Sequence, residues 1–237
     1  MKILTFQHLD VEHSGRFGEF WRAAGHREHV VELDAGEPIP PLEDHDILAV
    51  MGGPMDVWQE DLHPWLAPEK AAIRRWVRDL GRPYLGICLG HQLLAEAMGG
   101  KTGLMAAPEV GLAQVHLTPA GLADPTLAGL PPTIDTLQWH GAEVARLPEG
   151  TAILASNAAC QTQAIRVGPR AYGFQFHVEI TEQTVADWRG IPEYRASLEQ
   201  ALGPEKAARL GQDLAPHLPA FRDMARQLND NFLTGIR

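Results

Sequence analysis

The chain has few cysteines, no long apolar run and no run of lysine or arginine, and each absence excludes a class of protein. Only Cys88 and Cys160 occur in 237 residues; a secreted disulfide framework needs more, so free thiols in a reducing cytoplasm are expected. The net charge of −10 argues against nucleic acid or an anionic membrane as the main partner. No apolar run reaches membrane-spanning length, and the one in "MKILTFQHLD" is too short for a signal peptide. A cytoplasmic protein is therefore the expectation.

What the first half does contain is short apolar runs that alternate with amphipathic segments. Strands are expected at 2–6, 29–33, 46–50 and 83–87, and helices at 15–25 and 67–80. Fully apolar strands separated by helices are typical of a parallel sheet that is covered on both faces. The pattern predicts an α/β fold with a doubly wound, mostly parallel sheet flanked by helices.

The second half changes character. Strand-like runs at 111–118, 151–156, 162–167 and 171–176 have few helices between them, which indicates a mixed or antiparallel extension of the sheet. From Thr181 the chain reads as helical to its end, with breaks at Pro192, Pro204, Pro216 and Pro219. We expect one domain over residues 1–190 and a helical appendage over 191–237 packed on it. The appendage is either a cap on the domain or an element for interaction.

Cys88 lies in the stretch Gly86-Ile87-Cys88-Leu89-Gly90, directly after an expected strand and before an expected helix. A nucleophile on a sharp strand–helix turn, with glycine two residues before and after it, forms a nucleophile elbow. The positive N-terminal end of the helix would then stabilise a thiolate. The alternative is a structural cysteine buried in an apolar stretch. The pattern alone leaves both open, because a nucleophile also needs a base.

A candidate base occurs in "GFQFHVEIT", residues 173–181. If the preceding strand runs into the site, His177 and Glu179 point to the same side, so the carboxylate can orient the imidazole and the imidazole can serve the thiol. The alternative is a strand-end histidine followed by a helix-start acid. No phosphate-binding G-x-x-x-x-G-K-[ST] loop and no H-E-x-x-H zinc pattern occurs, so neither ATP nor a metal or other cofactor is expected.

Four ordered motifs together resemble the class I (triad) glutamine amidotransferase family. They are "GGP" at 52–54, "GICLGHQLLAEAMGG" at 86–100, "WHG" at 139–141 and "GFQFHVE" at 173–179. Within that family the chain looks most like the stand-alone branch related to the glutaminase domain of GMP synthetase. The resemblance implies a flavodoxin-like domain that releases ammonia from the side-chain amide of glutamine.

The resemblance also implies a role for each matching residue. Cys88 would be the nucleophile that forms a γ-glutamyl thioester, His177 the proton carrier, and Glu179 the residue that orients His177. Backbone N–H groups of Gly53 and Leu89 would form the oxyanion hole.

Three further positions match residues that hold the substrate's α-amino and α-carboxylate groups in the family, namely Gln92, His140 and Gly141. The alternatives are a helix-surface amide for Gln92 and a loop histidine for His140. One departure from the family pattern is Val178, which stands where many members carry proline. Valine is compatible with an extended backbone, so the His177–Glu179 geometry should survive.

The substrate is then expected to be glutamine or another γ-glutamyl compound, and two enzyme functions stay open. Fewer than 60 residues follow Glu179, so a synthetase or acceptor-binding partner would be a separate chain. Alternatively, the chain acts alone as a hydrolase of γ-glutamyl peptides or amides. A silent binding or regulatory module, and the related cysteine-elbow proteases and chaperone-like proteins, are disfavoured because Cys88, His177 and Glu179 are all present.

Overall fold

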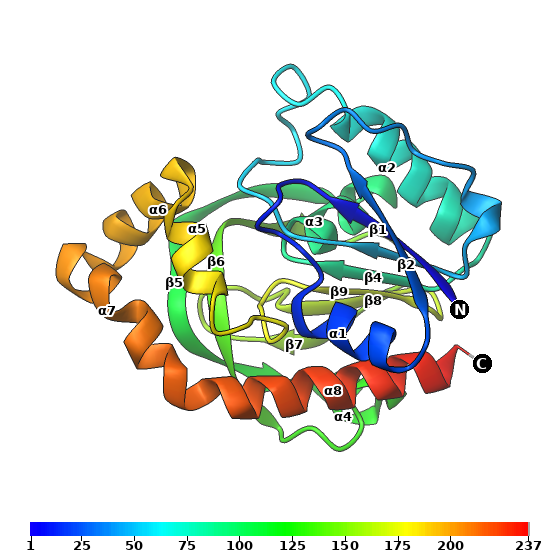
Figure 1. Ribbon diagram of the computed structural model, residues 1–237. Coiled ribbons are helices and arrows are strands. Elements are labelled where there is room, and N and C mark those ends of the chain that lie inside the picture. The colour runs from blue at the N-terminus through cyan, green and yellow to red at the C-terminus, as the bar shows by residue number, and fades with distance from the viewer. Residues whose placement is uncertain (237) are drawn as a thin grey trace.

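Five parallel strands direct their carboxyl ends to one edge of the sheet, where Cys88 follows the fourth strand in the chain. The computed structural model describes residues 1–236 (Figure 1). These strands are β1 (Lys2–Gln7), β2 (Arg27–Glu32), β3 (Ile47–Val50), β4 (Tyr84–Ile87) and β9 (Ala171–Phe174). They lie in the order β2-β1-β3-β4-β9, and every neighbouring pair is parallel. This is the strand order of flavodoxin-like doubly wound sheets, so the predicted fold class is confirmed.

Beyond β9 the sheet continues with antiparallel strands, as the sequence predicted. Their order is β8 (Ala164–Val167), β7 (Thr151–Ser156), β5 (Lys101–Leu117) and β6 (Thr133–Arg146). Two features differ from the expectation: β6 was not predicted, and β5 begins at Lys101 rather than near 111. The early part of β5 contains Gly103 and Pro108, residues that normally interrupt strands. A register irregularity between Leu104 and Glu109 accommodates them in the long β5–β6 ribbon.

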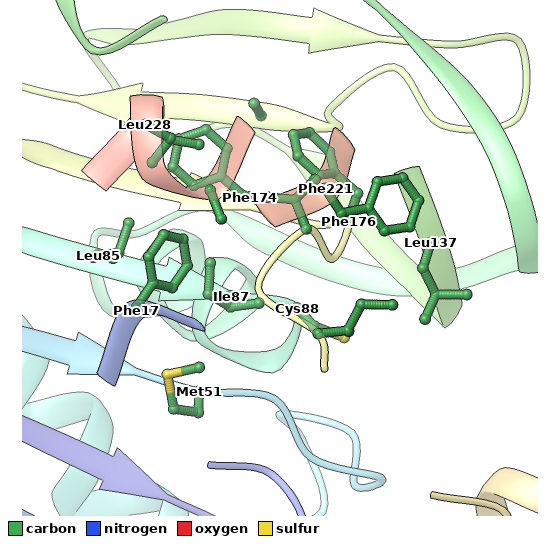
Figure 2. Packing of buried hydrophobic residues seen from close by; sticks show 14 of the residues in the cluster. Phe17, Met51, Leu85, Ile87, Cys88, Leu137, Phe174, Phe176, Phe221 and Leu228 are labelled. Atoms are coloured by element: carbon green, nitrogen blue, oxygen red, sulfur yellow. The ribbon is translucent and has the colours of Figure 1, made fainter. Parts of the chain in front are cut away.

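Helices cover both faces of the sheet because the strands alternate their side chains between two apolar cores. In β3, Ala49 faces one core, which α1 (Gly15–Ala23) and α8 (Leu218–Gly235) cover. Leu48 faces the other core, which α2 (Leu66–Arg74) and α3 (Leu89–Ala97) cover. Figure 2 shows the first core, in which Phe17 of α1 lies near Leu85 and Ile87 of β4, and Phe221 of α8 lies near Phe174 of β9.

The expected helix over 67–80 forms as α2 followed by a π-helical turn, η2 (Arg75–Asp79). Short elements complete the middle of the chain: η1 (Leu42–Asp44), α4 (Pro119–Ala123) and η3 (Pro125–Leu127).

The C-terminal segment is helical, as predicted, and its helices after the first one begin at or beside the prolines. They are α5 (Thr184–Arg189), α6 (Pro192–Leu202), α7 (Pro204–Leu214), η4 (Ala215–His217) and α8. The last helix returns to α1, where the Trp21 indole donates a hydrogen bond to Asn229 Oδ1 at 2.8 Å. The division at residue 190 stays a prediction. Within residues 1–236, none of the helices has the length and apolar character needed to cross a membrane.

Candidate active site

Cys88 is the N-cap residue of α3 and follows β4 directly, as the elbow pattern predicted. Its φ of 51° makes it the one non-glycine residue with positive φ among residues 1–236. A backbone held in this sparsely populated region costs about 1–3 kcal/mol and needs support from its surroundings. Support comes from the Cys88 N–H, which donates to the Phe174 carbonyl at 2.8 Å, and from the Cys88 carbonyl, which accepts from the Gln92 N–H at 3.2 Å.

The two glycines of the elbow, Gly86 and Gly90, allow a close approach of backbone segments. The elbow pattern in the sequence predicted this close approach. A Cβ atom on Gly90 would lie 2.0 Å from the Val50 carbonyl oxygen of β3. A Cβ atom on Gly86 would lie 2.6 Å from the backbone of Gly90 itself. Strand β4 and helix α3 can therefore turn on Cys88 only because both positions lack a side chain.

His177 and Glu179 form a buried pair, as their spacing predicted. His177 Nδ1 lies 2.6 Å from Glu179 Oε1, and both side chains are at most 5% exposed. The second carboxylate oxygen accepts from the Val178 N–H at 3.0 Å, a bond that proline at this position could not donate. Burial lowers the pKa of His177, but the Glu179 carboxylate and a hydrogen bond with Cys88 outweigh it and raise this pKa well above its ordinary value.

Cys88 opens into a cavity of about 180 Å³. Gly53 and Leu89 line the same cavity. Leu89 is the first residue of α3, so its N–H has no partner within the helix. Three elements supply most of the remaining wall: the loop after β3, strand β6, and helix α6. Their lining residues are Pro54, Met55, Asp56, Trp139, His140, Gly141, Ala142, Glu193, Tyr194 and Ser197.

Gln92 lines this cavity and is 4% exposed, so the alternative of a helix-surface amide is wrong. Its Nε2 donates to Gln175 Oε1 at 3.0 Å and to the Ala142 carbonyl at 3.2 Å. Gln175 in turn donates from Nε2 to Cys88 Sγ at 3.6 Å. Sequence reasoning missed Gln175, although it lies inside the "GFQFHVE" motif two residues before His177. A chain of amides thus connects Gln92 to the thiol.

His140 and Gly141 also line the cavity, and they lie on strand β6 rather than in a loop. His140 Nδ1 is 2.9 Å from the Ala142 carbonyl, and Nε2 is 3.3 Å from Glu109 Oε2. His140 is 5% exposed, so its ring is fixed by the strand and its neighbours. A side chain at position 141 would approach Pro108 at 3.8 Å. The three predicted substrate-binding positions are therefore together in one wall.

An aromatic cluster joins the His177–Glu179 pair to the C-terminal helices, and sequence reasoning missed it. The Trp188 ring of α5 meets the His177 ring edge-on with centroids 4.8 Å apart. Trp188 also packs against Tyr194 of α6 at 5.6 Å, and both contact Trp139 of β6. Helices α5 and α6 therefore supply aromatic rings that pack beside His177.

Glu12 is a second buried acid beside the site, and sequence reasoning missed it. It accepts a hydrogen bond from the Tyr194 hydroxyl and is 4% exposed. Burial, helped by the nearby Glu179 carboxylate, raises the pKa of Glu12 to about 7. His177, Tyr194 and His8 act in the opposite direction but do not outweigh burial. The signal in the sequence was its position: Glu12 follows β1 at the sheet edge where the carboxyl ends of the parallel strands gather.

Glu12 should make the protein less stable as pH rises from about 4.5 to about 7. The unfolded chain loses this proton near 4.5 and the native chain near 7, so the native state binds more protons between these values. The free energy of unfolding should therefore fall by about 3 kcal/mol across this window, with no difference below it. Glu12→Gln should remove this dependence. Urea unfolding of both chains at pH 5 and pH 8 measures it, and parallel changes in the two chains would contradict the prediction.

A cysteine at a strand–helix elbow, facing a histidine that a carboxylate orients, is the arrangement of enzymes that cleave amides through a covalent intermediate. Comparison with known proteins gives the family. The family model described as "Glutamine amidotransferase class-I" matches residues 21–186. The chain belongs to the class-I glutamine amidotransferase family.

Relatives of known sequence and structure agree with this assignment. The chain is 36% identical over 168 residues to one subunit of the glutamine-hydrolyzing GMP synthase from Sulfurisphaera tokodaii, covering 70% of this chain and 85% of that one. It is 29% identical to the putative glutamine amidotransferase-like protein YfeJ from Salmonella typhimurium, covering 78% of each chain. A solved glutamine amidotransferase from Methylobacillus flagellatus aligns with a TM-score of 0.85 at 26% identity, covering 100% of this chain and 95% of that one.

Proposed function

We propose that the chain hydrolyses the side-chain amide of glutamine, or of a related γ-glutamyl compound, through a thioester on Cys88. The observation that carries this proposal is the position of Cys88 at a strained elbow, close enough to His177 to raise the pKa of its imidazole, whose Nδ1 lies 2.6 Å from Glu179. Family membership supports the reaction class, and the residue roles are our inference from this geometry.

In the first half of the reaction, Cys88 Sγ attacks the carboxamide carbon and its proton passes to His177 Nε2. His177 then gives this proton to the departing nitrogen, so the C–N bond breaks and ammonia leaves. Glu179 holds Nδ1–H, which keeps Nε2 directed at the sulfur and stabilises the imidazolium that forms. The product on the enzyme is a γ-glutamyl thioester.

In the second half, His177 takes a proton from water, whose oxygen attacks the thioester carbon, and returns the proton to the sulfur as glutamate leaves. Both halves pass through a tetrahedral oxyanion. We assign the Leu89 N–H at the start of α3 and the Gly53 N–H as the donors to it, and the position of both residues in the cavity beside Cys88 supports this assignment. One such donor lowers the barrier by about 3–4 kcal/mol.

The substrate's amino-acid end would lie against Gln92, His140 and Gly141, which form one wall of the same cavity. The charged side chains on the wall are the carboxyls of Asp56 and Glu193, which suit the α-amino group of the substrate. Backbone groups of β6 are then left for the α-carboxylate. This orientation directs the γ-carbonyl carbon toward Cys88.

A second candidate is a hydrolase of γ-glutamyl peptides or amides that acts without a partner. The observation that favours it is the contribution of α6, because Glu193, Tyr194 and Ser197 complete the cavity wall from this chain's own C-terminal segment. Relatives named as single subunits of GMP synthase favour the other arrangement, in which a separate synthetase chain receives the ammonia. Both arrangements use the same thioester.

The test is to follow glutamate and ammonia release from free glutamine and from a panel of γ-glutamyl dipeptides. Acid-quenched samples are digested, and mass spectrometry locates any γ-glutamyl adduct. An adduct on the peptide that contains Cys88 is expected. Fast turnover of a dipeptide would identify a self-sufficient hydrolase, whereas an adduct with slow turnover of every compound would identify a subunit that needs its synthetase. Turnover with an adduct elsewhere, or with none at any time point, would overturn the thioester proposal.

A further inference from the structure

A second histidine–carboxylate pair lies under the cavity, and the reaction described above does not use it. His8, directly after β1, and Glu69 of α2 are both fully buried, with His8 Nε2 2.9 Å from Glu69 Oε1. His8 Nδ1 is 2.8 Å from the Gly52 carbonyl oxygen. The ring also stacks on Trp65 with centroids 5.3 Å apart. Both nitrogens and one face of this imidazole ring are therefore in contact with other groups.

Nδ1 of His8 carries hydrogen, because the Gly52 carbonyl oxygen that it faces can only accept. Nε2 faces Glu69 Oε1, and one proton is shared within that pair. Burial lowers the pKa of His8, but the Glu69 carboxylate outweighs burial and raises it overall. His8 thus donates to Gly52 with Nδ1 while Glu69 holds the other side of the ring.

The Gly52 carbonyl and the Gly53 N–H belong to the same peptide group. No cis peptide occurs within the part of the chain that the structure describes, and in a trans peptide the C=O and N–H bonds point in opposite directions. Fixing the carbonyl oxygen on His8 therefore directs the Gly53 N–H away from His8. Gly53 lines the cavity beside Cys88 and Leu89, and we infer that the side of the peptide away from His8 is the side that faces this cavity.

The two glycines make this peptide dependent on its hydrogen bond, because glycine has the fewest barriers to rotation about φ and ψ. A side chain at either glycine would have to displace a neighbouring side chain. A Cβ atom at Gly52 would lie 2.4 Å from Glu12 Oε2, and one at Gly53 would lie 2.6 Å from Met55 Sδ. With glycine at both positions, the flexible peptide needs an external group to hold it.

We propose that His8, held by Glu69, is a positioning residue that fixes the Gly52–Gly53 peptide with its N–H directed at the oxyanion. The proposal rests on the proposed function, since it assumes that an oxyanion forms beside Cys88. A buried ion pair is a poor way to gain stability, because well-packed apolar residues of similar volume are often as good or better. Orientation of a catalytic donor is a function that an apolar pair could not perform.

The test compares His8→Leu, which removes the donor and keeps an apolar packing partner, with His8→Asn, whose amide nitrogen can replace the Nδ1 donor. For His8→Leu we expect kcat to fall about 10- to 100-fold with little change in the KM for the γ-glutamyl substrate, because the donor acts on the transition state. His8→Asn should recover a substantial part of that loss. His63→Leu is the matched control, since His63 also contacts Trp65, at 5.6 Å between centroids, but has no bond to Gly52.

Alkylation of Cys88 by iodoacetamide separates positioning from general damage to the site. This displacement at an alkyl carbon forms no oxyanion, so its rate reports only the thiolate and its access. We expect the rate in His8→Leu to stay within about twofold of the wild type. An alkylation rate that falls together with kcat would overturn the proposal and indicate a purely structural role, as would an unchanged kcat.

Crystal structures of the His8→Leu and Glu69→Gln chains test the proposal even if the wild type turns nothing over. A Gly52–Gly53 peptide that is rotated or disordered in these variants is the expected result, and a peptide in the wild-type orientation in both would overturn it. Failure of the proposed function would look different, because wild-type Cys88 would then form no γ-glutamyl adduct. Glu69→Gln keeps His8 in place for packing and remains informative if His8→Leu does not fold.

Discussion

Replacing Cys88 with alanine is expected to lower the turnover of every γ-glutamyl substrate by about 10⁴-fold or more. In the proposed mechanism the thiol supplies the electron pair that forms the thioester, and losing a covalent nucleophile removes nearly all of the catalysis that its base and orienting acid provide. The alanine variant keeps the same backbone and only one heavy atom is lost. Its fold should therefore persist, and substrate should still bind. Steady-state release of glutamate and ammonia measures the effect, with thermal unfolding recorded beside it.

The chain provides its own matched control, because Cys160 is its only other cysteine. Cys160 is fully buried, its thiol lies 3.6 Å from the Thr162 hydroxyl, and burial raises its pKa to about 11. This cysteine therefore stays a neutral thiol. Cys160→Ala should keep turnover within about twofold of the wild type. Turnover that survives Cys88→Ala but is lost in Cys160→Ala would show that the elbow is not the reaction centre.

The sequence was sufficient for the parallel half of the fold because its central strands are buried on both faces. A run such as Ile47–Val50 is apolar throughout, so its burial can be read without knowing its neighbours. Strand β6 could not be read in this way. Thr136, Gln138 and His140 are buried although they are polar, because they face amides, carbonyls and the cavity rather than an apolar core. Strand β6 therefore lacks the apolar alternation that identifies most strands.

The residues of the candidate site divide by a similar rule. The candidate residues Cys88, His177 and Glu179 could be predicted because each lies in a local sequence pattern. Cys88 lies in a glycine-flanked turn, and His177 and Glu179 are two residues apart. Glu12 could not, because its burial depends on Tyr194, a residue 182 positions later that arrives on α6. His8 likewise depends on Glu69, which is 61 positions away. Groups that act through distant partners become visible only when the fold brings those partners together.

Replacing Gly90 with alanine is expected to have the largest effect on stability, and it tests why the elbow needs glycine. The added Cβ would lie 2.0 Å from the Val50 oxygen and 2.7 Å from the Val50 carbonyl carbon. Both atoms belong to the backbone of central strand β3, which cannot move aside as a flexible side chain would. Helix α3 must shift instead, which stretches the hydrogen bond from the Gly90 N–H to the Met51 carbonyl, now 3.1 Å. We expect a loss of more than about 3 kcal/mol in the free energy of unfolding.

The same shift would move Cys88, since the elbow residue is joined to α3 and immediately precedes it. A displacement near 1 Å of a nucleophile costs about 100-fold in rate, so the folded fraction of Gly90→Ala should also be nearly inactive. Gly103→Ala on β5 is the control: its nearest neighbour would be the Ala145 Cβ at 3.9 Å, so its stability should change by less than about 0.5 kcal/mol. Urea unfolding of the two variants gives the comparison, and an insoluble Gly90→Ala beside a soluble Gly103→Ala is the same result in its extreme form. Equal stability of the two would mean that α3 tolerates the extra atom, and the close packing of the elbow would then not explain its glycines.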